Sequence, residues 1–176
     1  MTDIKSFIRT IPHHPKQGIM FRDITTLLKD PKGLQLLVDG LAEQYANQKI
    51  DKIVGIEARG FVIGAAVAYK LGVGFVPIRK SGKLPAQTIQ QEYALEYGTD
   101  VMEIHQDAIA KSEQVLLVDD LIATGGTAMT AVSLINQLGG NIVGCAFVID
   151  LPDKGGANIL LAKGLKVFSL CQFNGE

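Results

Sequence analysis

Two adjacent carboxylates, Asp119 and Asp120, lie just before a short run of glycine and hydroxyl residues at 123–127. Four aliphatic residues without a polar break precede them, which is the pattern of a strand buried on both faces. Beyond them, apolar residues recur at helical spacing over 128–138 and end at two glycines, a helix stop. We therefore expect a strand, an acidic pair, a glycine-rich loop and a helix, in this order.

The glycine-rich loop has the chemistry of a phosphate site. A helix N-terminus offers unpaired N–H groups and the positive end of the peptide dipoles. The two glycines leave no Cβ between the backbone and an anion, and the two threonines add hydroxyl donors. The residues that we expect to bind a phosphate monoester are Ala123, Thr124, Gly125, Gly126 and Thr127.

The acidic pair needs a different partner, because carboxylates repel a phosphate. One sugar length away, Asp119 and Asp120 can accept hydrogen bonds from two neighbouring ribose hydroxyls. They can also help to hold, through water, a Mg²⁺ ion that those hydroxyls chelate. The predicted ligand is therefore a ribose 5-phosphate. The alternative is an ordinary strand-to-helix loop whose aspartates are solvated.

Two commoner nucleotide motifs, G-x-x-x-x-G-K-[ST] and G-x-G-x-x-G after a strand, are absent from the sequence. The segment at 115–127 instead closely resembles the phosphoribosyl-pyrophosphate signature of type I phosphoribosyltransferases. F-R-D-I at 21–24, E-A-R-G-F at 57–61, R-K-x-G-K-L-P at 79–85 and L-E-Y-G at 95–98 resemble adenine phosphoribosyltransferases. The pattern is followed only loosely at 150–156. The resemblance covers most of the chain.

A second strand-to-helix turn, E-A-R-G at 57–60, resembles an anion site and adds a guanidinium that can grip two phosphate oxygens. The alternative is that Arg59 pairs with Glu57 on the surface. In the family that the chain resembles, this loop holds pyrophosphate, and its first peptide bond is expected to be cis. The pyrophosphate-binding residues that the resemblance implies are Glu57, Ala58, Arg59, Gly60, Lys80 and Lys83.

The resemblance implies a purine-salvage reaction. A 5-phosphoribosyl group passes from Mg²⁺-bound phosphoribosyl pyrophosphate to N9 of adenine, giving AMP and pyrophosphate. Because positive charge develops on the sugar and negative charge on the leaving group, catalysis should be mostly electrostatic and positional. By resemblance, Arg59 and Lys83 stabilise the leaving group, and Glu96 handles the purine proton. Asp119 and Asp120 favour the developing charge on the sugar.

The base is predicted from hydrogen-bonding groups. Enzymes that use 6-oxopurines commonly carry a lysine near the end of the strand after the signature helix, and residues 141–149 contain none. Adenine presents an amino donor beside a ring acceptor, which one backbone C=O and N–H near Met20 can match. Phe21, which alone would be predicted to plug the sheet edge, can sandwich the ring with Leu121. The predicted base-binding residues are Met20, Phe21, Arg22 and Leu121.

Two other functions stay open at this point. One is a phosphoribosyltransferase for another purine, xanthine or a 6-oxopurine. The other is a regulator that senses phosphoribosyl pyrophosphate without transferring it. A regulator needs an output module, and about 25 residues before the core are too few for a helix-turn-helix domain.

The elements that position these residues alternate between strand and helix. This order predicts an α/β fold with three layers, a mostly parallel central sheet flanked by helices, and ligands at the carboxyl ends of the strands. Strands are expected at 52–56, 74–79, 115–118, 142–149 and 165–170, and helices at 3–9, 31–47, 61–71, 128–138 and 155–162. Asp30 should cap the helix at 31–47.

Two segments are predicted to cover the site. Residues 12–23 are expected to be a loop, within a short N-terminal hood over the base at 1–26. Residues 80–97 form a long polar segment, which we interpret as a mobile hairpin lid with a strand pair that continues through 101–104. The alternative is a solvated basic hairpin. His13 and His14 are expected to be exposed loop residues rather than metal ligands.

Composition limits the class of protein. With 176 residues the chain fits one domain, 1–176, and 17 basic against 18 acidic residues give no footprint for nucleic acid or an acidic membrane. The most apolar region is too short to span a bilayer, and the N-terminus lacks a signal-peptide pattern. Cys145 and Cys171 are expected to be core residues, which favours the cytoplasm. The resemblance suggests a homodimer.

Overall fold

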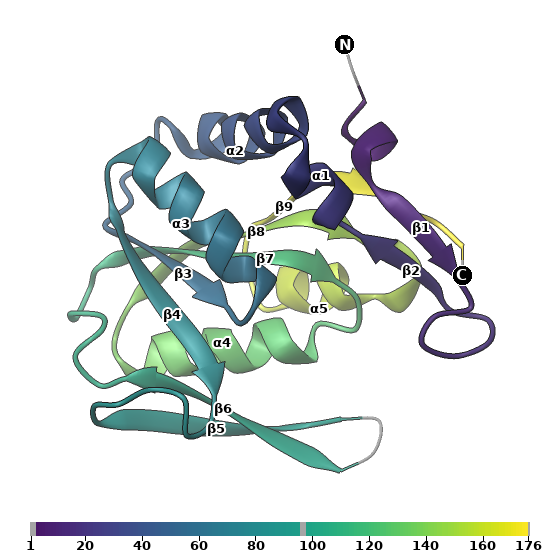
Figure 1. Cartoon of the computed structure of the whole chain (residues 1–176). Helices are drawn as coiled ribbons and strands as arrows, with labels where there is room; N and C mark the ends of the chain where they lie inside the picture. Colours follow the sequence, from purple (N-terminus) through teal and green to yellow (C-terminus); the bar gives the residue numbers. More distant parts are fainter. Residues whose placement is uncertain (1–2, 96–97, 176) are drawn as a thin grey trace.

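The computed structural model describes residues 3–95 and 98–175, so Glu96 lies outside the described residues. Its middle layer is a seven-stranded sheet with the order β5-β6-β4-β3-β7-β8-β9 (Figure 1). The strands are β3 (Lys52–Ile56), β4 (Gly74–Lys80), β5 (Thr88–Ala94), β6 (Thr99–His105), β7 (Gln114–Ile122), β8 (Asn141–Asp150) and β9 (Val167–Gln172). The pairings from β4 through β3, β7 and β8 to β9 are parallel, whereas β6 pairs antiparallel with both β4 and β5.

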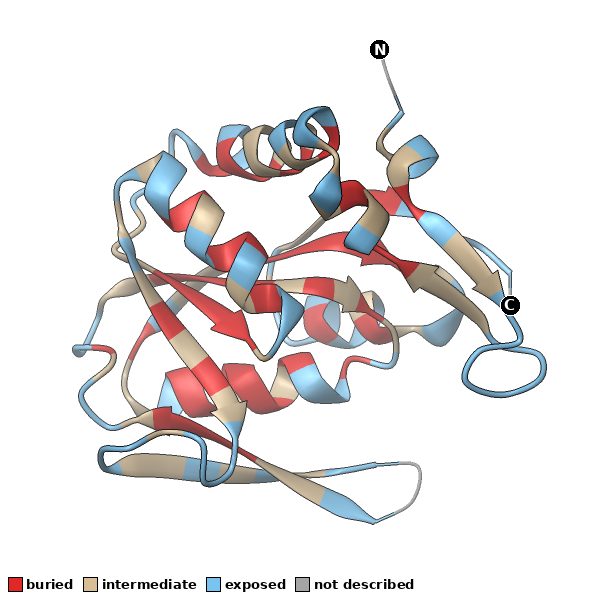
Figure 2. Cartoon of the chain, viewed as in Figure 1, coloured by how far each residue is buried: buried red, intermediate tan, exposed pale blue. Residues whose placement is uncertain are grey.

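Helices cover both faces of this sheet. The main helices are α2 (Pro31–Tyr45), α3 (Arg59–Leu71), α4 (Gly126–Gln137) and α5 (Gly156–Ala162). The shorter elements are η1 (Ile4–Phe7), α1 (Thr25–Lys29) and η2 (Pro152–Lys154). Buried residues concentrate in the central strands and on the helix faces turned toward them (Figure 2). The predicted three-layer, mostly parallel α/β fold is confirmed.

The apolar run in β7 is explained by two separate cores. Leu116 and Val118 pack in the cluster that contains buried residues of α2 and α3. Val115 and Leu117 pack in the cluster that contains α4 and α5. Because side chains alternate along a strand, a strand covered on both faces needs apolar residues at every position.

The N-terminal segment corrects one prediction. Residues 12–23 are not all loop, because β1 (Arg9–Pro12) and β2 (Met20–Asp23) form an antiparallel hairpin that is separate from the main sheet. These strands lack a continuous apolar pattern, so their pairing depends on contacts that a local sequence window does not show. Between them, His13 and His14 are exposed, as predicted. Asp30 caps α2 as predicted, accepting hydrogen bonds from two backbone N–H groups at 2.9 Å.

Two element boundaries also differ from the predictions. β7 does not end at Val118 but continues through both aspartates to Ile122, because β8 pairs with it as far as Asp150. The helix expected to start at residue 61 begins at Arg59. The acidic pair and the last two residues of E-A-R-G, Arg59 and Gly60, are therefore held by regular structure.

The segment predicted as a lid is largely a hairpin. β5 and β6 pair from Thr88 opposite His105 to Ala94 opposite Thr99, and β6 joins the main sheet through β4. The strand pair is thus longer than the one expected through 101–104. Ile89 and Tyr93 of β5 pack against the core on the α4 side.

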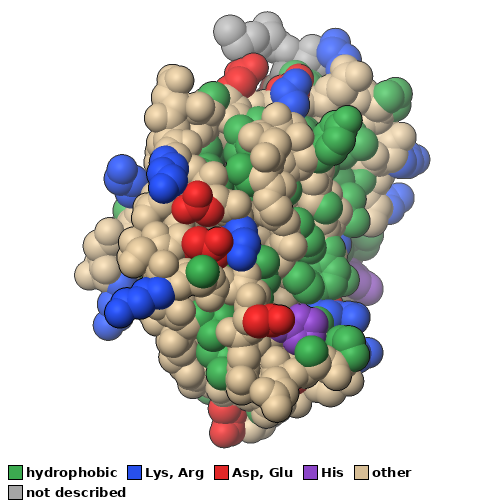
Figure 3. Space-filling view, turned by 90° about the vertical axis from the view of Figure 1, so that its left-hand side faces the viewer, with side chains coloured by type: hydrophobic (Ala, Val, Ile, Leu, Met, Phe, Trp, Pro, Cys, Tyr) green, Lys and Arg blue, Asp and Glu red, His purple; other side chains and the backbone are tan. Residues whose placement is uncertain are grey.

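The distribution of charges on the surface and the burial of the cysteines agree with what the composition predicted. Acidic and basic side chains are interspersed, with hydrophobic residues between them, on the face shown in Figure 3. Cys145 and Cys171 are buried and free, as predicted. No helix among the described residues is long and apolar enough to cross a membrane.

Candidate active site

A cavity of about 400 Å³ lies at the carboxyl ends of the central strands. It is bordered by β2, by the start of α3, by the end of β7 and by the loop that leads into α4. The predicted site residues that line it are Met20, Phe21, Arg22, Glu57, Ala58, Arg59, Asp119, Asp120, Leu121, Ala123, Thr124, Gly125, Gly126 and Thr127. Three others, Gly60, Lys80 and Lys83, are not among the lining residues.

The glycine-rich loop has the shape that an anion site needs. Gly125 has φ +86°, a left-handed conformation that favours glycine, and a Cβ on it would lie 3.0 Å from Cα of Gly156. A Cβ on Gly126 would meet nothing within 4 Å, so the backbone there is open. The N-terminus of α4 has no side-chain cap. Its first N–H groups are therefore available to a ligand.

This loop rests on a segment whose role the sequence did not reveal. The N–H of Gly156 donates to the carbonyl of Ala123 at 2.8 Å, and that of Leu151 donates to the carbonyl of Ile122 at 3.0 Å. A Cβ on Gly156 would lie 2.4 Å from the Ala123 oxygen, so a larger residue would push the loop away. The adjacent glycines at 155–156 were the only local feature of the sequence that could have indicated this close packing.

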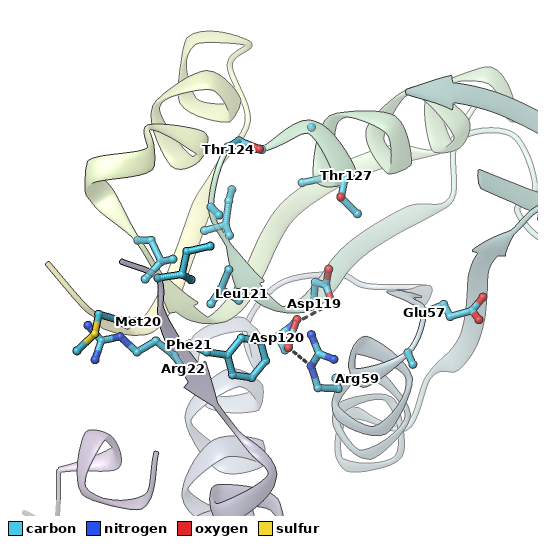
Figure 4. A pocket seen from close by; sticks show the side chains of 18 residues that line it. Met20, Phe21, Arg22, Glu57, Arg59, Asp119, Asp120, Leu121, Thr124 and Thr127 are labelled. Carbon is cyan, nitrogen blue, oxygen red and sulfur yellow. Dashed lines mark hydrogen bonds and ion pairs between the residues drawn. The ribbon is translucent and has the colours of Figure 1, made fainter. Parts of the chain in front are cut away.

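The two aspartates lie differently in the cavity. Asp120 is buried, and its carboxylate pairs with Nε of Arg59, whereas Asp119 is half-buried (Figure 4). Oδ1 of Asp119 accepts the N–H of Asp120 at 2.9 Å. Burial and the charge of Asp120 raise the pKa of Asp119 well above its ordinary value of 3.8. Of the two, Asp119 is the one that forms no ion pair with the described residues.

The contacts of the E-A-R-G turn exclude the alternative that Arg59 pairs with Glu57 on the surface. Arg59 does not pair with Glu57, because Glu57 binds Arg79 through Nε at 3.1 Å and Nη2 at 3.3 Å. Glu57 also accepts the N–H of Lys80 at 3.0 Å. The peptide bond between Glu57 and Ala58 is cis, as predicted.

The remaining predicted pyrophosphate residues lie beside the cavity. A Cβ on Gly60 would lie 3.0 Å from Oδ1 of Asp119, so Gly60 lets α3 approach β7. Nζ of Lys80 binds Asp100 at 3.1 Å. Lys83 is exposed in the turn after β4, outside the cavity lining. These three positions stay predictions as ligand contacts.

The residues predicted to bind the base lie on strand β2 and at Leu121 of β7. Figure 4 shows the Phe21 ring directed toward Asp120 and Arg59, with Leu121 close to it on β7. Arg22 contributes to the lining, but its Nη1 donates to the hydroxyl of Thr10 at 2.7 Å. Its guanidinium also lies 4.4 Å from the centre of the Phe173 ring. The charge of Arg22 is thus directed into the hood.

Asp23, the last residue of β2, fixes this strand through contacts that the sequence interpretation missed. It is buried, and its Oδ2 accepts Nε of Arg9 at 3.1 Å and the hydroxyl of Thr25 at 2.9 Å. Its Oδ1 accepts the N–H of Thr25 at 2.9 Å. These contacts lower the pKa of Asp23 to about 2, with the hydrogen bond from Arg9 as the main cause. The aspartate in F-R-D-I was the feature of the sequence that could have indicated this role.

Comparison with known proteins decides the family. The phosphoribosyl transferase domain matches residues 24–167. The adenine phosphoribosyltransferase of Methylobacillus flagellatus is 65% identical over 171 residues, which is 97% of each chain. The chain belongs to the adenine phosphoribosyltransferase family. The predicted family and enzyme class are thereby confirmed.

Solved structures of this family have the same fold. The adenine phosphoribosyltransferase of Thermoanaerobacter pseudethanolicus has a TM-score of 0.92 and 48% identity, covering 97% of this chain and 98% of that chain. The adenine phosphoribosyltransferase of Saccharomyces cerevisiae, complexed with D-2,5-dideoxy-2,5-imino-altritol 1,6-bisphosphate and adenine, has a TM-score of 0.89 and 41% identity. That match covers 96% of each chain.

Proposed function

We propose that the cavity transfers the 5-phosphoribosyl group of phosphoribosyl pyrophosphate to N9 of adenine, giving AMP and pyrophosphate in purine salvage. The observation that carries this proposal is the meeting of three chemically distinct walls in one cavity. An open helix N-terminus, the acidic pair, and the apolar side chains of Phe21 and Leu121 all line it. A phosphate, a sugar and a flat base need these three surfaces in this combination.

The phosphate and sugar roles follow from the walls. Residues 123–127 bind the 5-phosphate through backbone N–H and threonine hydroxyl groups. Asp119 accepts hydrogen bonds from the ribose hydroxyls. Arg59 exchanges its bond to Asp120 for the pyrophosphate, whose higher charge makes it the stronger acceptor, and Asp120 then becomes available to the sugar.

The carboxylates suit a Mg²⁺ ion that arrives with the substrate. Mg²⁺ prefers about six oxygen ligands and keeps several waters, so one or two carboxylates are enough. No three His, Cys, Asp or Glu side chains gather as a metal site within the part of the chain that the structure describes. Asp119 and Asp120 would contact the ion through water, and the bound ion would neutralise charge on the pyrophosphate.

The reaction is a substitution at C1 of the ribose. The bond from C1 to the pyrophosphate oxygen breaks, the bond from N9 to C1 forms, and the N9 proton leaves. Asp119 and Asp120 stabilise the positive charge that develops on the sugar, and Arg59 and Lys83 stabilise the leaving group. Glu96 is the proposed acceptor of the proton, by resemblance to the family.

Adenine is recognised at the hood. Phe21 and Leu121 hold the ring between them, and the backbone of Met20 supplies the acceptor and donor that match its amino group and ring nitrogen. Stacking contributes about 1–3 kcal/mol per base and does not distinguish purines, so selectivity comes from the hydrogen bonds.

A turnover assay tests the function. The protein is mixed with phosphoribosyl pyrophosphate, Mg²⁺ and, separately, adenine, hypoxanthine, guanine or xanthine, and the release of pyrophosphate is measured. We expect strong preference for adenine. Preference for another purine would overturn the base assignment alone. Binding of the activated sugar without turnover of any base would identify a sensor instead.

We further propose that residues 80–97 act as a lid and residues 1–26 as a hood within one domain, 1–176. The turn at 81–87 is mostly exposed, whereas Thr88 begins a paired strand. Limited proteolysis should therefore cut between Ser81 and Gln91 in the free protein, mainly before Thr88, and more slowly with a pyrophosphate analogue bound. Equal rates with and without the analogue would indicate a static hairpin.

We also propose a homodimer in the cytoplasm. Light scattering coupled to size-exclusion chromatography measures the assembly, and a monomer mass would contradict it. Fractionation of cells that express the full chain tests the location.

A further inference from the structure

One carboxylate outside the cavity is almost fully buried and is not used by the proposed reaction. Glu103 is 2% exposed and lies in β6, opposite Arg79 of β4 and Gln90 of β5. A buried charge is costly unless several donors surround it. The placement of these donors therefore indicates what the charge organises.

Two of the donors belong to the turn after β4. Oε1 of Glu103 accepts the N–H of Lys83 at 3.0 Å and the N–H of Leu84 at 2.9 Å. The other oxygen, Oε2, accepts Nε2 of Gln90 at 3.1 Å and the hydroxyl of Thr88 at 3.3 Å. Burial would raise the pKa of Glu103, but these N–H groups lower it. The carboxylate thus stays ionised and ties the turn to the hairpin.

The same turn is held from its other side by a residue that contacts the cavity wall. Nη1 of Arg79 donates to the carbonyl of Lys83 at 3.4 Å while the guanidinium grips Glu57, a lining residue. Both backbone groups of Lys83 are therefore bonded. The charge of Lys83 is also close enough to contribute to lowering the pKa of Glu57, after Arg79 and the N–H of Lys80 and against the effect of burial.

We infer that Glu103 is a positioning residue that fixes the turn carrying Lys83, so that the ammonium group of Lys83 is presented to the pyrophosphate. This inference rests on the proposed function. A carboxylate that only stabilised the hairpin would need donors from β5 and β6. Here its two shortest hydrogen bonds come from Lys83 and the residue after it.

The decisive experiment is a double-mutant cycle with Glu103→Gln and Lys83→Ala, followed by steady-state kinetics. A glutamine keeps the shape and one acceptor oxygen for the turn, but it removes the negative charge that strengthens the bonds from the N–H groups of Lys83 and Leu84. The other end of its amide becomes a donor that faces Gln90, so the turn is held less firmly. We expect the KM for phosphoribosyl pyrophosphate to rise about tenfold in Glu103→Gln, with the KM for adenine unchanged. In the Lys83→Ala background, the same substitution should change little.

Two further variants serve as control and reserve. Asp51→Asn removes a carboxylate that also holds a backbone N–H, that of Gln114 at 2.7 Å, where β7 begins. It should leave both KM values unchanged. Gln90→Met removes one donor to Glu103 from an exposed position, so it should fold even if Glu103→Gln does not. It should raise the KM for phosphoribosyl pyrophosphate in the same direction by a smaller factor.

Several outcomes would overturn the inference. Equal changes in both KM values, or a lower unfolding temperature with unchanged kinetics, would make Glu103 a fold residue only. A full effect of Glu103→Gln in the Lys83→Ala background would show that it does not act through Lys83. If the wild-type protein releases no pyrophosphate with any base, the proposed function itself fails, which the wild-type assay detects separately.

Discussion

Two hairpins, one that lines the cavity through β2 and one outside its lining, are attached to the molecule in different ways. The hood hairpin, β1 and β2, is a separate two-stranded sheet, and side-chain bonds from Asp23 to Arg9 and Thr25 fix its strand β2. The hairpin of β5 and β6 continues the seven-stranded sheet through backbone pairing with β4. We name the side of the cavity at β2 the base edge and the side at Glu57 the pyrophosphate edge, after the ligands proposed for them. A substitution at the base edge should therefore act locally, whereas one at the pyrophosphate edge acts through the sheet.

The largest effect is expected where the two edges meet. Asp119→Asn and Asp120→Asn should each lower kcat/KM by about a hundredfold, because each removes a charge that stabilises the transition state. Asp120→Asn also releases Arg59 from its ion pair. Steady-state kinetics and thermal unfolding measure the two consequences. Wild-type kinetics in both variants would contradict the assignment of Asp119 and Asp120 to the sugar. The sugar would then not lie between the two edges as proposed.

At the base edge, Phe21→Ala should raise the KM of every purine that is used by about 10- to 100-fold, in line with a stacking free energy of about 1–3 kcal/mol. The KM for phosphoribosyl pyrophosphate, measured in the same variant, is the control and should stay unchanged. A rise in that value as well would show that the hood affects both ends of the cavity. The effect of the substitution would then not be local to the base edge.

At the pyrophosphate edge, Glu57→Gln should give the opposite pattern. It weakens the two bonds to Arg79 and the bond from the N–H of Lys80. We expect about a tenfold rise in the KM for phosphoribosyl pyrophosphate and no change for adenine. Titration with pyrophosphate as product inhibitor should show the same loss. A rise confined to the KM for adenine would show that Glu57 acts on the base and not on the pyrophosphate.

The same contrast explains what the sequence could predict. The predicted phosphate loop could be recognised because its glycines, its hydroxyls and the helix behind them are adjacent in the chain. The ion pair between Arg59 and Asp120 joins residues 61 positions apart, and nothing local to either residue names the other. The hood strands were missed for a related reason, since their pairing is fixed by contacts of Asp23 rather than by an apolar pattern.

Glu103 shows how the position of a residue in the sheet decides whether it fixes a neighbouring segment. Glu103 sits in a segment that looks like an ordinary polar strand, and its function depends on the turn that folds over it. A sequence window contains both, but it does not show that they face each other. Roles of the individual site residues, including Glu96 outside the described residues, stay predictions until they are tested by substitution.

The smallest kinetic effect is expected from Asp23→Asn, which weakens the hood anchor without touching the cavity lining. The KM for adenine should rise a few-fold, and the free energy of unfolding near neutral pH should fall by about 1–3 kcal/mol. The stronger test is its pH dependence. The pKa of Asp23 is lowered from 3.8 to about 2 in the folded protein, so the carboxylate stabilises the fold above pH 3.8.

That stabilisation is lost as the pH falls from 3.8 toward about 2, because the unfolded chain takes up the proton first. Denaturant unfolding of the wild-type protein should therefore lose more stability over this interval than the Asp23→Asn variant does, and the two curves should converge at the acid end. Parallel curves would mean that Asp23 is not held by the bond to Arg9. The hood would then be fixed by packing alone, and the difference in attachment between the two edges would disappear.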